Sequence, residues 1–245
     1  VIRMDIDEDA VDKVYMWLNP VADAIPDIAN ADYSLETQIS GGVAGIRINS
    51  LGVQTAVSNI DEIRTGFAFR DVSSKFGSSD PDLIAYEPFN YDENASIIGA
   101  GGENAFWLNA WFDRGQGGDN VQKIVDGSLS IEGYESSGNR ARLELIEAGK
   151  QIRIDRTLAE PIINDGSTYW MSFLMFSEDT PVKNQVGNIT LKSSAVTSND
   201  GQVIAFGRIY STGNLGLITP QNNTATVTDK PDKGLSWIVV KIVTT

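Results

Sequence analysis

The 245-residue sequence contains no cysteine and no histidine. Without histidine, the chain cannot form a Ser–His or Cys–His nucleophile pair, an imidazole general base near neutral pH, or the usual histidine-containing zinc site. Without cysteine it has no disulfide. A chain of this length can bury a core large enough to fold without one.

Basic residues are scarce. The sequence has 19 lysines and arginines against 33 aspartates and glutamates, which gives a formal net charge of −14 at pH 7. Nucleic acids and anionic membranes attract proteins through basic surfaces, so we expect neither as a partner. Divalent cations and neutral surfaces such as sugars remain open.

Long hydrophobic runs are also missing. No window of 18 consecutive apolar residues occurs, so we expect no membrane insertion. Val1 opens directly on a strand-like run rather than on the basic and apolar regions of a signal peptide, which predicts a mature or excised form if the protein is exported. The lack of cysteine fits export, and we expect an extracellular or cell-surface location.

What the sequence does contain is a repeated two-residue alternation of apolar and polar side chains, typical of β-strands. The 23 glycines and 8 prolines separate the alternating segments. The best helical candidate is a short turn at residues 59–64, which also fits a strand. The pattern predicts an all-β sandwich. The predicted strands are 13–18, 45–48, 129–131, 143–146, 151–154, 169–176, 188–191, 203–206 and 237–243.

Several short phrases carry a family resemblance. They are 86–91 (YEPFNY), 101–102 with Trp107 and Trp111, 126–129 (DGSL), 138–140 (GNR), 156–158 (RTL), 169–173 (YWMSF) and 237–242, together with 1–7, 14–20 and 61–66 near the start of the chain. The sequence resembles the concanavalin/laminin-G-like jelly-roll domains of large secreted bacterial proteins. The resemblance implies a jelly-roll β-sandwich.

The order of these phrases differs from that of the family. Residues 1–72 resemble the C-terminal part of the jelly roll, residues 82–245 resemble its N-terminal part, and residues 73–81 connect the two. Three arrangements fit this order: a circular permutant closed within one chain, a stretch of a tandem array, or an exchange in which residues 1–72 complete a neighbouring subunit.

The family's strand at the cut resembles two segments of this chain, at its start and near its end. We expect both to act as assembly strands, through Val1, Ile2 and Met4 in the first and Trp237, Val239 and Lys241 in the second. Strand edges of this kind add to one another through main-chain hydrogen bonds. The expected partner is therefore another copy of the chain, in a homo-oligomer or filament.

An acidic segment near the start is a candidate metal site. Asp5, Asp7 and Asp9 alternate, and oxygen ligands of this kind suit calcium, the one cofactor we expect. The segment lacks the glycine and the final glutamate of an EF-hand loop, so a solvated acidic hairpin is the alternative. Asp61 and Glu62 form a second candidate, which Arg64 could neutralise.

Two further functions can be weighed from the residues. Hydrolysis of glycosidic bonds needs paired carboxylates, and no Glu-x-Asp-x-x-Glu spacing occurs, so we expect no enzyme. Trp107 and Trp111 lie near glycine-rich loops and could stack on sugars, although tryptophans in a sandwich are commonly part of the core. The sequence thus favours a non-catalytic extracellular assembly module, a subunit of a surface filament, layer or adhesin, with a carbohydrate-binding lectin-like module as the alternative.

Overall fold

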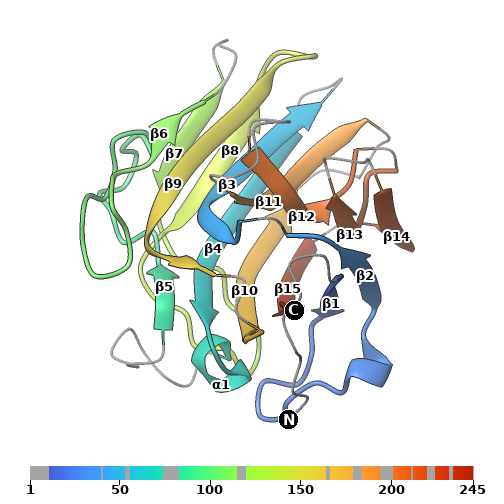
Figure 1. Cartoon of the computed structure of the whole chain (residues 1–245). Coiled ribbons are helices and arrows are strands. Elements are labelled where there is room, and N and C mark those ends of the chain that lie inside the picture. The colour runs from blue at the N-terminus through green and yellow to red at the C-terminus, as the bar shows by residue number, and fades with distance from the viewer. Residues whose placement is uncertain are drawn as a thin grey trace.

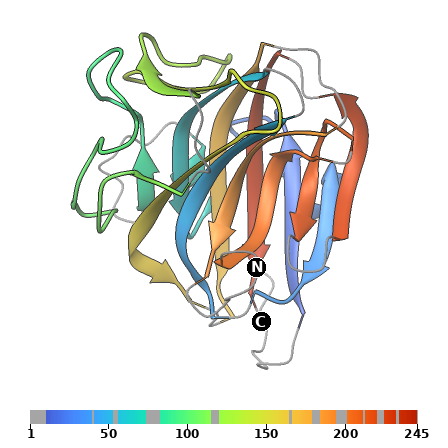
Figure 2. The same ribbon diagram turned by 90° about the horizontal axis from the view of Figure 1, so that it is seen from above.

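Antiparallel β-strands form almost all the regular structure, as the alternating pattern predicts. The computed structural model describes residues 11–39, 41–52, 56–73, 83–114, 120–163, 166–178, 184–193, 201–210, 212–219, 224–231 and 234–244. Within these ranges the strands form two antiparallel sheets, which pack as a sandwich (Figures 1 and 2). The described residues contain no helix with the length and hydropathy needed to cross a bilayer.

The first sheet has eight strands among the described residues. In spatial order they are β2 (Tyr33–Thr37), β1 (Asp12–Leu18), β15 (Gly234–Val243), β10 (Thr168–Ser177), β4 (Ala56–Gly66), β8 (Arg140–Leu145) and β7 (Val121–Val125), with β5 (Leu83–Glu87) paired to the end of β4. The α-helix α1 (Phe69–Val72) follows β4, and a 3₁₀ turn η1 (Ile28–Asn30) precedes β2.

The second sheet has seven strands in the part of the chain described. Their spatial order is β14 (Thr224–Pro231), β13 (Asn214–Thr219), β12 (Gln202–Arg208), β11 (Gln185–Lys192), β3 (Val43–Gly52), β9 (Gln151–Ile162) and β6 (Phe112–Asp113). Residues 1–72 therefore contribute strands to both sheets, because β3 lies in this one and β1, β2 and β4 lie in the first.

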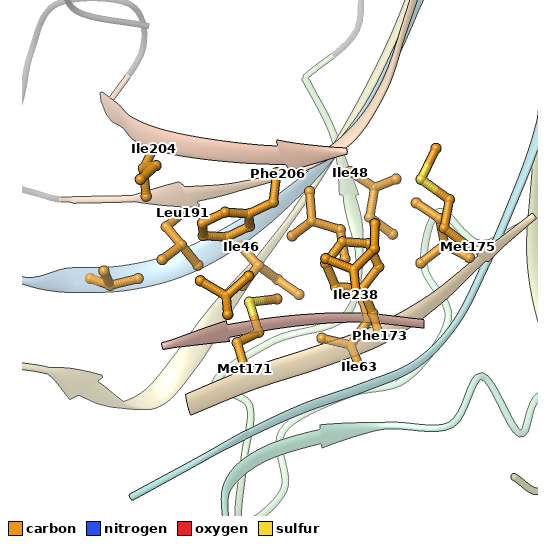
Figure 3. Close-up of a cluster of buried hydrophobic side chains, with 14 of the residues drawn as sticks. Ile46, Ile48, Ile63, Met171, Phe173, Met175, Leu191, Ile204, Phe206 and Ile238 are labelled. Atoms are coloured by element: carbon orange, nitrogen blue, oxygen red, sulfur yellow. The ribbon is translucent and has the colours of Figure 1, made fainter. Parts of the chain in front are cut away.

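The main core lies between the two sheets. Figure 3 shows side chains from both sheets meeting there, and all ten that it labels are at most 2% exposed. Ile46 and Ile48 of β3 point inward from the second sheet, and Phe173 of β10 meets them from the first. Apolar burial on this scale is the main stabilising term of the fold.

A second apolar layer covers the outer face of the first sheet. Trp170 and Leu174 of β10 belong to it, while Phe173 between them faces the main core. The Trp170 ring stacks on Trp17 of β1, with centroids 5.7 Å apart, and α1 covers the cluster through Phe69. This second layer explains why residues 169–176 are apolar at nearly every position rather than at every second one.

The structure confirms most of the predicted strands and corrects two segments. Residues 59–64 lie in strand β4, so the helical candidate is wrong. The alternation fails there because Ser172 pairs with Arg64 but Leu174 pairs with Asp61, which leaves an extra residue on β4 as a bulge. Residues 129–131 do not form a strand: Ile131 starts a tight turn to Tyr134.

Replacement of Phe173 by alanine tests the position of the core. Its side chain is 0% exposed, so Phe173→Ala should lower the free energy of unfolding by about 3–5 kcal/mol. Val21→Ala, at a position 72% exposed, should change it by no more than about 0.5 kcal/mol. Urea unfolding measures both values, and equal losses would contradict this core.

Candidate functional site

A groove lined by both polar and apolar residues lies on the outer face of the second sheet. Its volume is about 130 Å³, less than the ~300–1,000 Å³ of sites that enclose a whole small molecule. It can therefore hold one polar group or ring of a larger ligand. The residues that line it are Asn49, Gln151, Val186, Asn188, Thr190, Gln202, Ala205, Ile209, Tyr210 and Ile218.

Strand alternation sets the chemistry of this groove. Ile48 and Ile189 are register partners that point into the core. Their neighbours Asn49 and Asn188 are also register partners and point to the opposite face. Paired side chains on one face of a sheet lie close enough to interact. The same period that buries isoleucine therefore brings the two amides together.

Hydrogen bonds fix the central amide of the groove. The Asn49 side-chain nitrogen donates to the Asn188 Oδ1 oxygen at 3.0 Å and to Thr190 Oγ1 at 2.6 Å, and Thr190 Oγ1 donates to the same Asn188 oxygen at 3.2 Å. The reverse orientation of the Asn49 amide would place its oxygen against the Asn188 oxygen, and two acceptors repel. Asn188 is itself oriented by its side-chain nitrogen, which donates to the Arg208 carbonyl at 3.5 Å, and with Asn188 in this orientation the Asn49 nitrogen faces it.

The oxygen of the same amide, unlike its nitrogen, makes no hydrogen bond. Asn49 is 5% exposed, and its Oδ1 oxygen has no hydrogen-bond partner in the structure. A buried acceptor without a partner loses its hydration energy without compensation, at a cost of roughly 1–3 kcal/mol. A donor from a ligand or from a water molecule in the groove would remove this cost.

The rim and floor of the groove keep it accessible. Tyr210 follows β12 and is 43% exposed, so its ring offers a flat face beside the amides. Gly207 lies opposite Asn188 with a φ of 126°, and a Cβ atom there would meet the Gly187 carbonyl oxygen at 2.7 Å. A side chain at this position is disfavoured both by the backbone conformation and by the lack of space.

A charged row borders the groove on the same face. Arg47 of β3 makes a bidentate ion pair with Asp155 of β9, with N–O distances of 2.5 and 2.8 Å. Lys192 reaches the same carboxylate at 2.7 Å and Arg114 approaches it at 3.7 Å. Three cationic side chains thus converge on one carboxylate. Arg153, on the next outward position of β9, is the register partner of Asn49.

The two tryptophans expected to bind sugar are buried in this structure. Trp107 and Trp111 are each 1% exposed, so neither ring presents an open face to a ligand in this structure. The Trp107 indole nitrogen donates to the Tyr86 carbonyl at 3.0 Å, and that of Trp111 donates to the Glu87 carboxylate at 3.0 Å. They pack as core residues beneath the loops.

Those indoles surround a buried ion pair that anchors the loops of residues 88–111. Arg156 pairs with the Glu87 carboxylate and donates to the Asn109 and Gly102 carbonyls at 3.1 and 3.2 Å. Its guanidinium lies 4.7 Å from the Trp107 ring centroid. Burial raises the pKa of Glu87, and the Arg156 charge opposes this rise.

A more open hollow lies within the same loops. Its volume is about 540 Å³, and its lining runs from Asn90 to Ala100 and includes Asp92. Its walls are loop residues rather than a sheet face.

Asp61 and Glu62, the second candidate metal site, instead hold a loop against β4. Asp61 accepts hydrogen bonds from Ser128 Oγ and the Leu129 amide at 2.5 and 2.7 Å. Glu62 accepts from the Ser137 amide and pairs with Arg64, both at 2.7 Å. Glu62 has a φ of 52°, an uncommon conformation for a non-glycine residue, imposed by the bulge.

The remaining candidate metal ligands, Asp5, Asp7 and Asp9, lie outside the described residues. Among those that are described, no three acidic side chains come together in a way that could hold a metal ion. Arg64 occupies the position beside Glu62 that a cation would take. Calcium therefore remains an expectation from the acidic segment alone.

Of the two expected assembly strands, only the second lies among the described residues. Val1, Ile2 and Met4 lie outside the described residues. Trp237, Val239 and Lys241 lie on β15, which is paired on one side with β1 and on the other with β10 of the same chain. β15 is thus an interior strand in this structure, and burial lowers the pKa of its Lys241, which lies over the Trp170 ring.

Sequence reasoning misses the groove residues. The alternation predicts strands at 45–48 and 188–191, but it treats Asn49, Asn188 and Thr190 as ordinary outward-facing polar residues. A partial signal exists in residues 188–191, where the outward-facing Asn188 and Thr190 are both polar and uncharged. The local sequence pattern cannot show that the two strands are neighbours, because their pairing is part of the tertiary structure.

The carboxyl group of Asp61 predicts a dependence of stability on pH. Burial raises its pKa from the ordinary value of 3.8 to about 8, against the opposing effect of its hydrogen-bond donors. Between about pH 4 and pH 8 the folded state keeps a proton that the unfolded state releases, so the free energy of unfolding should fall as the pH rises. Urea unfolding at pH 5 and pH 8 measures the slope. Asp61→Asn should flatten it, and the exposed Asp23→Asn should not.

If the Asp61→Asn variant kept the slope of the unmodified protein, the titrating group would lie elsewhere. The overall stability of the variant is not the readout, because the substitution also introduces an N–H donor among the groups that donate to the carboxylate. Only the difference between the two pH values tests the assignment.

Comparisons with protein-family models, with curated proteins and with solved structures found no match to this chain. Its function is therefore argued from the geometry of the groove.

Proposed function

We propose that the chain is a non-catalytic, extracellular β-sandwich module that binds a saccharide in the groove of the second sheet. The observation that carries the proposal is Asn49, a residue of the groove lining that is only 5% exposed and whose buried Oδ1 oxygen has no hydrogen-bond partner in the structure. A sugar hydroxyl is a donor of the size and chemistry that this oxygen lacks.

The other lining residues suit the same class of ligand. Gln151 and Gln202 each carry a donor and an acceptor, which matches the dual character of a hydroxyl group. Tyr210 adds a half-exposed aromatic ring, whose face can pack on the apolar C–H face of a sugar. Few positioned polar groups beside a flat ring are the usual composition of a small-ligand site.

The groove also supports a binding role rather than a catalytic one. Hydrolysis of a glycosidic bond needs two carboxyl groups flanking the bond. The lining of the groove, as far as the structure describes it, includes no aspartate or glutamate. The neighbouring carboxylate of Asp155 is held by Arg47 and Lys192.

The proposal also includes the family and the strand order of the sandwich. We place the chain among concanavalin/laminin-G-like jelly rolls in permuted order, with residues 1–72 as the C-terminal part, 73–81 as the connection and 82–245 as the N-terminal part. Support comes from the interleaving of the two parts: β15 and β10 of the second part lie between β1 and β4 of the first in one sheet.

Calorimetric titration with a panel of oligosaccharides tests the binding proposal. At least one member should bind, and Gln151→Ala and Asn49→Ala should each weaken it about fivefold to tenfold, the effect of one hydrogen bond of about 1 kcal/mol or slightly more. Gln122→Ala is the matched control, since Gln122 lies on β7 of the other sheet and should leave binding unchanged.

If both groove variants bound the saccharide as tightly as the unmodified protein, the site would lie outside the groove. If no oligosaccharide of the panel bound, the proposal would be overturned. Circular dichroism of Asn49→Ala establishes whether the variant is folded. If it is not, Gln151→Ala decides alone, because the Gln151 side chain is only half-buried at the rim.

Assembly between copies is the second candidate function, and the pairing of β15 favours it. β15 is covered on one side by β1, a strand from the exchangeable part of the chain, through six aligned residue pairs from Lys13–Val243 to Leu18–Ile238. A neighbouring copy could supply the same strand with identical pairing, because strand addition uses main-chain hydrogen bonds. Filaments or rings would follow, since such a contact is head-to-tail.

The absence of cysteine makes this candidate directly testable. Tyr15 and Lys241 are register partners on β1 and β15, so the double variant Tyr15→Cys/Lys241→Cys places two thiols opposite each other. Oxidation should give covalent multimers on a non-reducing gel if the strand is exchanged, whereas a cross-linked monomer would exclude exchange. Tyr15→Cys alone is the control for random cross-linking.

A further inference from the structure

Cationic side chains gather at one place on the outer face of the second sheet, although the protein as a whole is acidic. The chain has a net charge of −14. On this face, however, the contacts of Asp155 gather three cationic side chains, those of Arg47, Arg114 and Lys192, around one carboxylate. An arrangement of three positive charges and one negative charge leaves a positive local field.

This positive region is continuous with the groove. Thr190, in the lining, is the register partner of Arg47, and Lys192 follows it two positions later on the same face of β11. On the other side, Arg153 of β9 stands beside Asn49. The unpartnered Asn49 oxygen therefore lies between a row of neutral amides and a row of cations.

The cations are held in place rather than extended into solvent. The Arg47 side chain is 0% exposed and that of Lys192 is 14% exposed. Arg114 is 49% exposed and lies with its guanidinium 5.3 Å from the Phe112 ring centroid. A ligand anion at this border would contact Arg114 and Lys192, while the buried Arg47 would act only through its charge, and ordered cations lose little conformational entropy on binding.

We propose that the saccharide bound in the groove is acidic, with a carboxylate or sulfate group beside the cationic row formed by Arg47, Arg114, Arg153 and Lys192. The neutral amides then hold the ring hydroxyls and the cations hold the anionic substituent. This inference rests on the proposed saccharide function and adds the charge of the ligand to it.

Two probes with the same backbone test the charge requirement. Trigalacturonate and its fully methyl-esterified form have the same sugar units and differ in charge. The acid should bind at least about tenfold more tightly than the ester. Its affinity should fall as sodium chloride is raised from about 50 to about 500 mM, because salt screens exposed charges. Dextran sulfate against dextran distinguishes a sulfate from a carboxylate as the preferred anion.

Variants at the cationic row give an independent readout. Arg114→Gln and Arg153→Gln should each weaken binding of the acid about twofold to fivefold, the size of a partly exposed ion pair, and leave binding of the ester unchanged. Lys123→Gln, on β7 of the first sheet, is the control and should change neither.

The outcomes separate this inference from the function on which it rests. The acidic and neutral members of both probe pairs could bind equally well, with binding weakened by Gln151→Ala. That result would overturn the charge requirement but keep the saccharide site in the groove. Binding of the acid that is unaffected by both arginine variants would also overturn it. No binding of any saccharide would remove both proposals.

Discussion

Neighbouring side chains of a β-strand point to opposite faces, and in strands β3, β9 and β11 this alternation produces the core and the groove together. Ile46, Ile48 and Ile189 face the first sheet, and the residues between them face outward as Arg47, Asn49 and Asn188. Since the register of a buried strand cannot shift without exposing its isoleucines, the packing of the core also fixes the polar residues of the groove. The amides at the centre of the candidate site are therefore positioned by the same strands that form the core.

Buried charge serves two purposes in this protein. The Glu87–Arg156 pair ties the loops of residues 88–111 to β9, and the Asp61 and Glu62 carboxylates hold another loop against the bulge of β4. The three carboxylates of these clusters have their partners within the chain, which gives them a structural role. At the groove the situation differs, because the Asn49 oxygen is left without a partner beside amide and hydroxyl groups that are already oriented. The groove thus combines a buried acceptor that lacks a partner with a lining of oriented polar groups.

The sequence predicts the sandwich because its longer strands alternate clearly or are apolar throughout, as residues 151–154 and 169–176 are. The prediction fails at β4, where the bulge at Glu62 interrupts the alternation, and at residues 129–131, whose apolar side chains pack in a turn rather than in a sheet. The tryptophans could not be assigned from local pattern either, because Trp111 is buried by contacts with Glu87 and Arg156, which are distant in sequence. The groove was beyond prediction for the same reason: Asn49 and Asn188 are 139 positions apart, and only the sheet order places them together.

The central claim is that ligand binding takes place on the outer face of the second sheet rather than at the glycine-rich loops. The most direct measurement is the nuclear magnetic resonance spectrum of side-chain amide and indole N–H groups during titration with an acidic oligosaccharide. The account predicts that the signals of Asn49, Asn188, Gln151 and Gln202 move together and saturate, while the indole signals of Trp107 and Trp111 stay in place. Movement of the two indole signals with unchanged groove amides would contradict it and return the site to the loops.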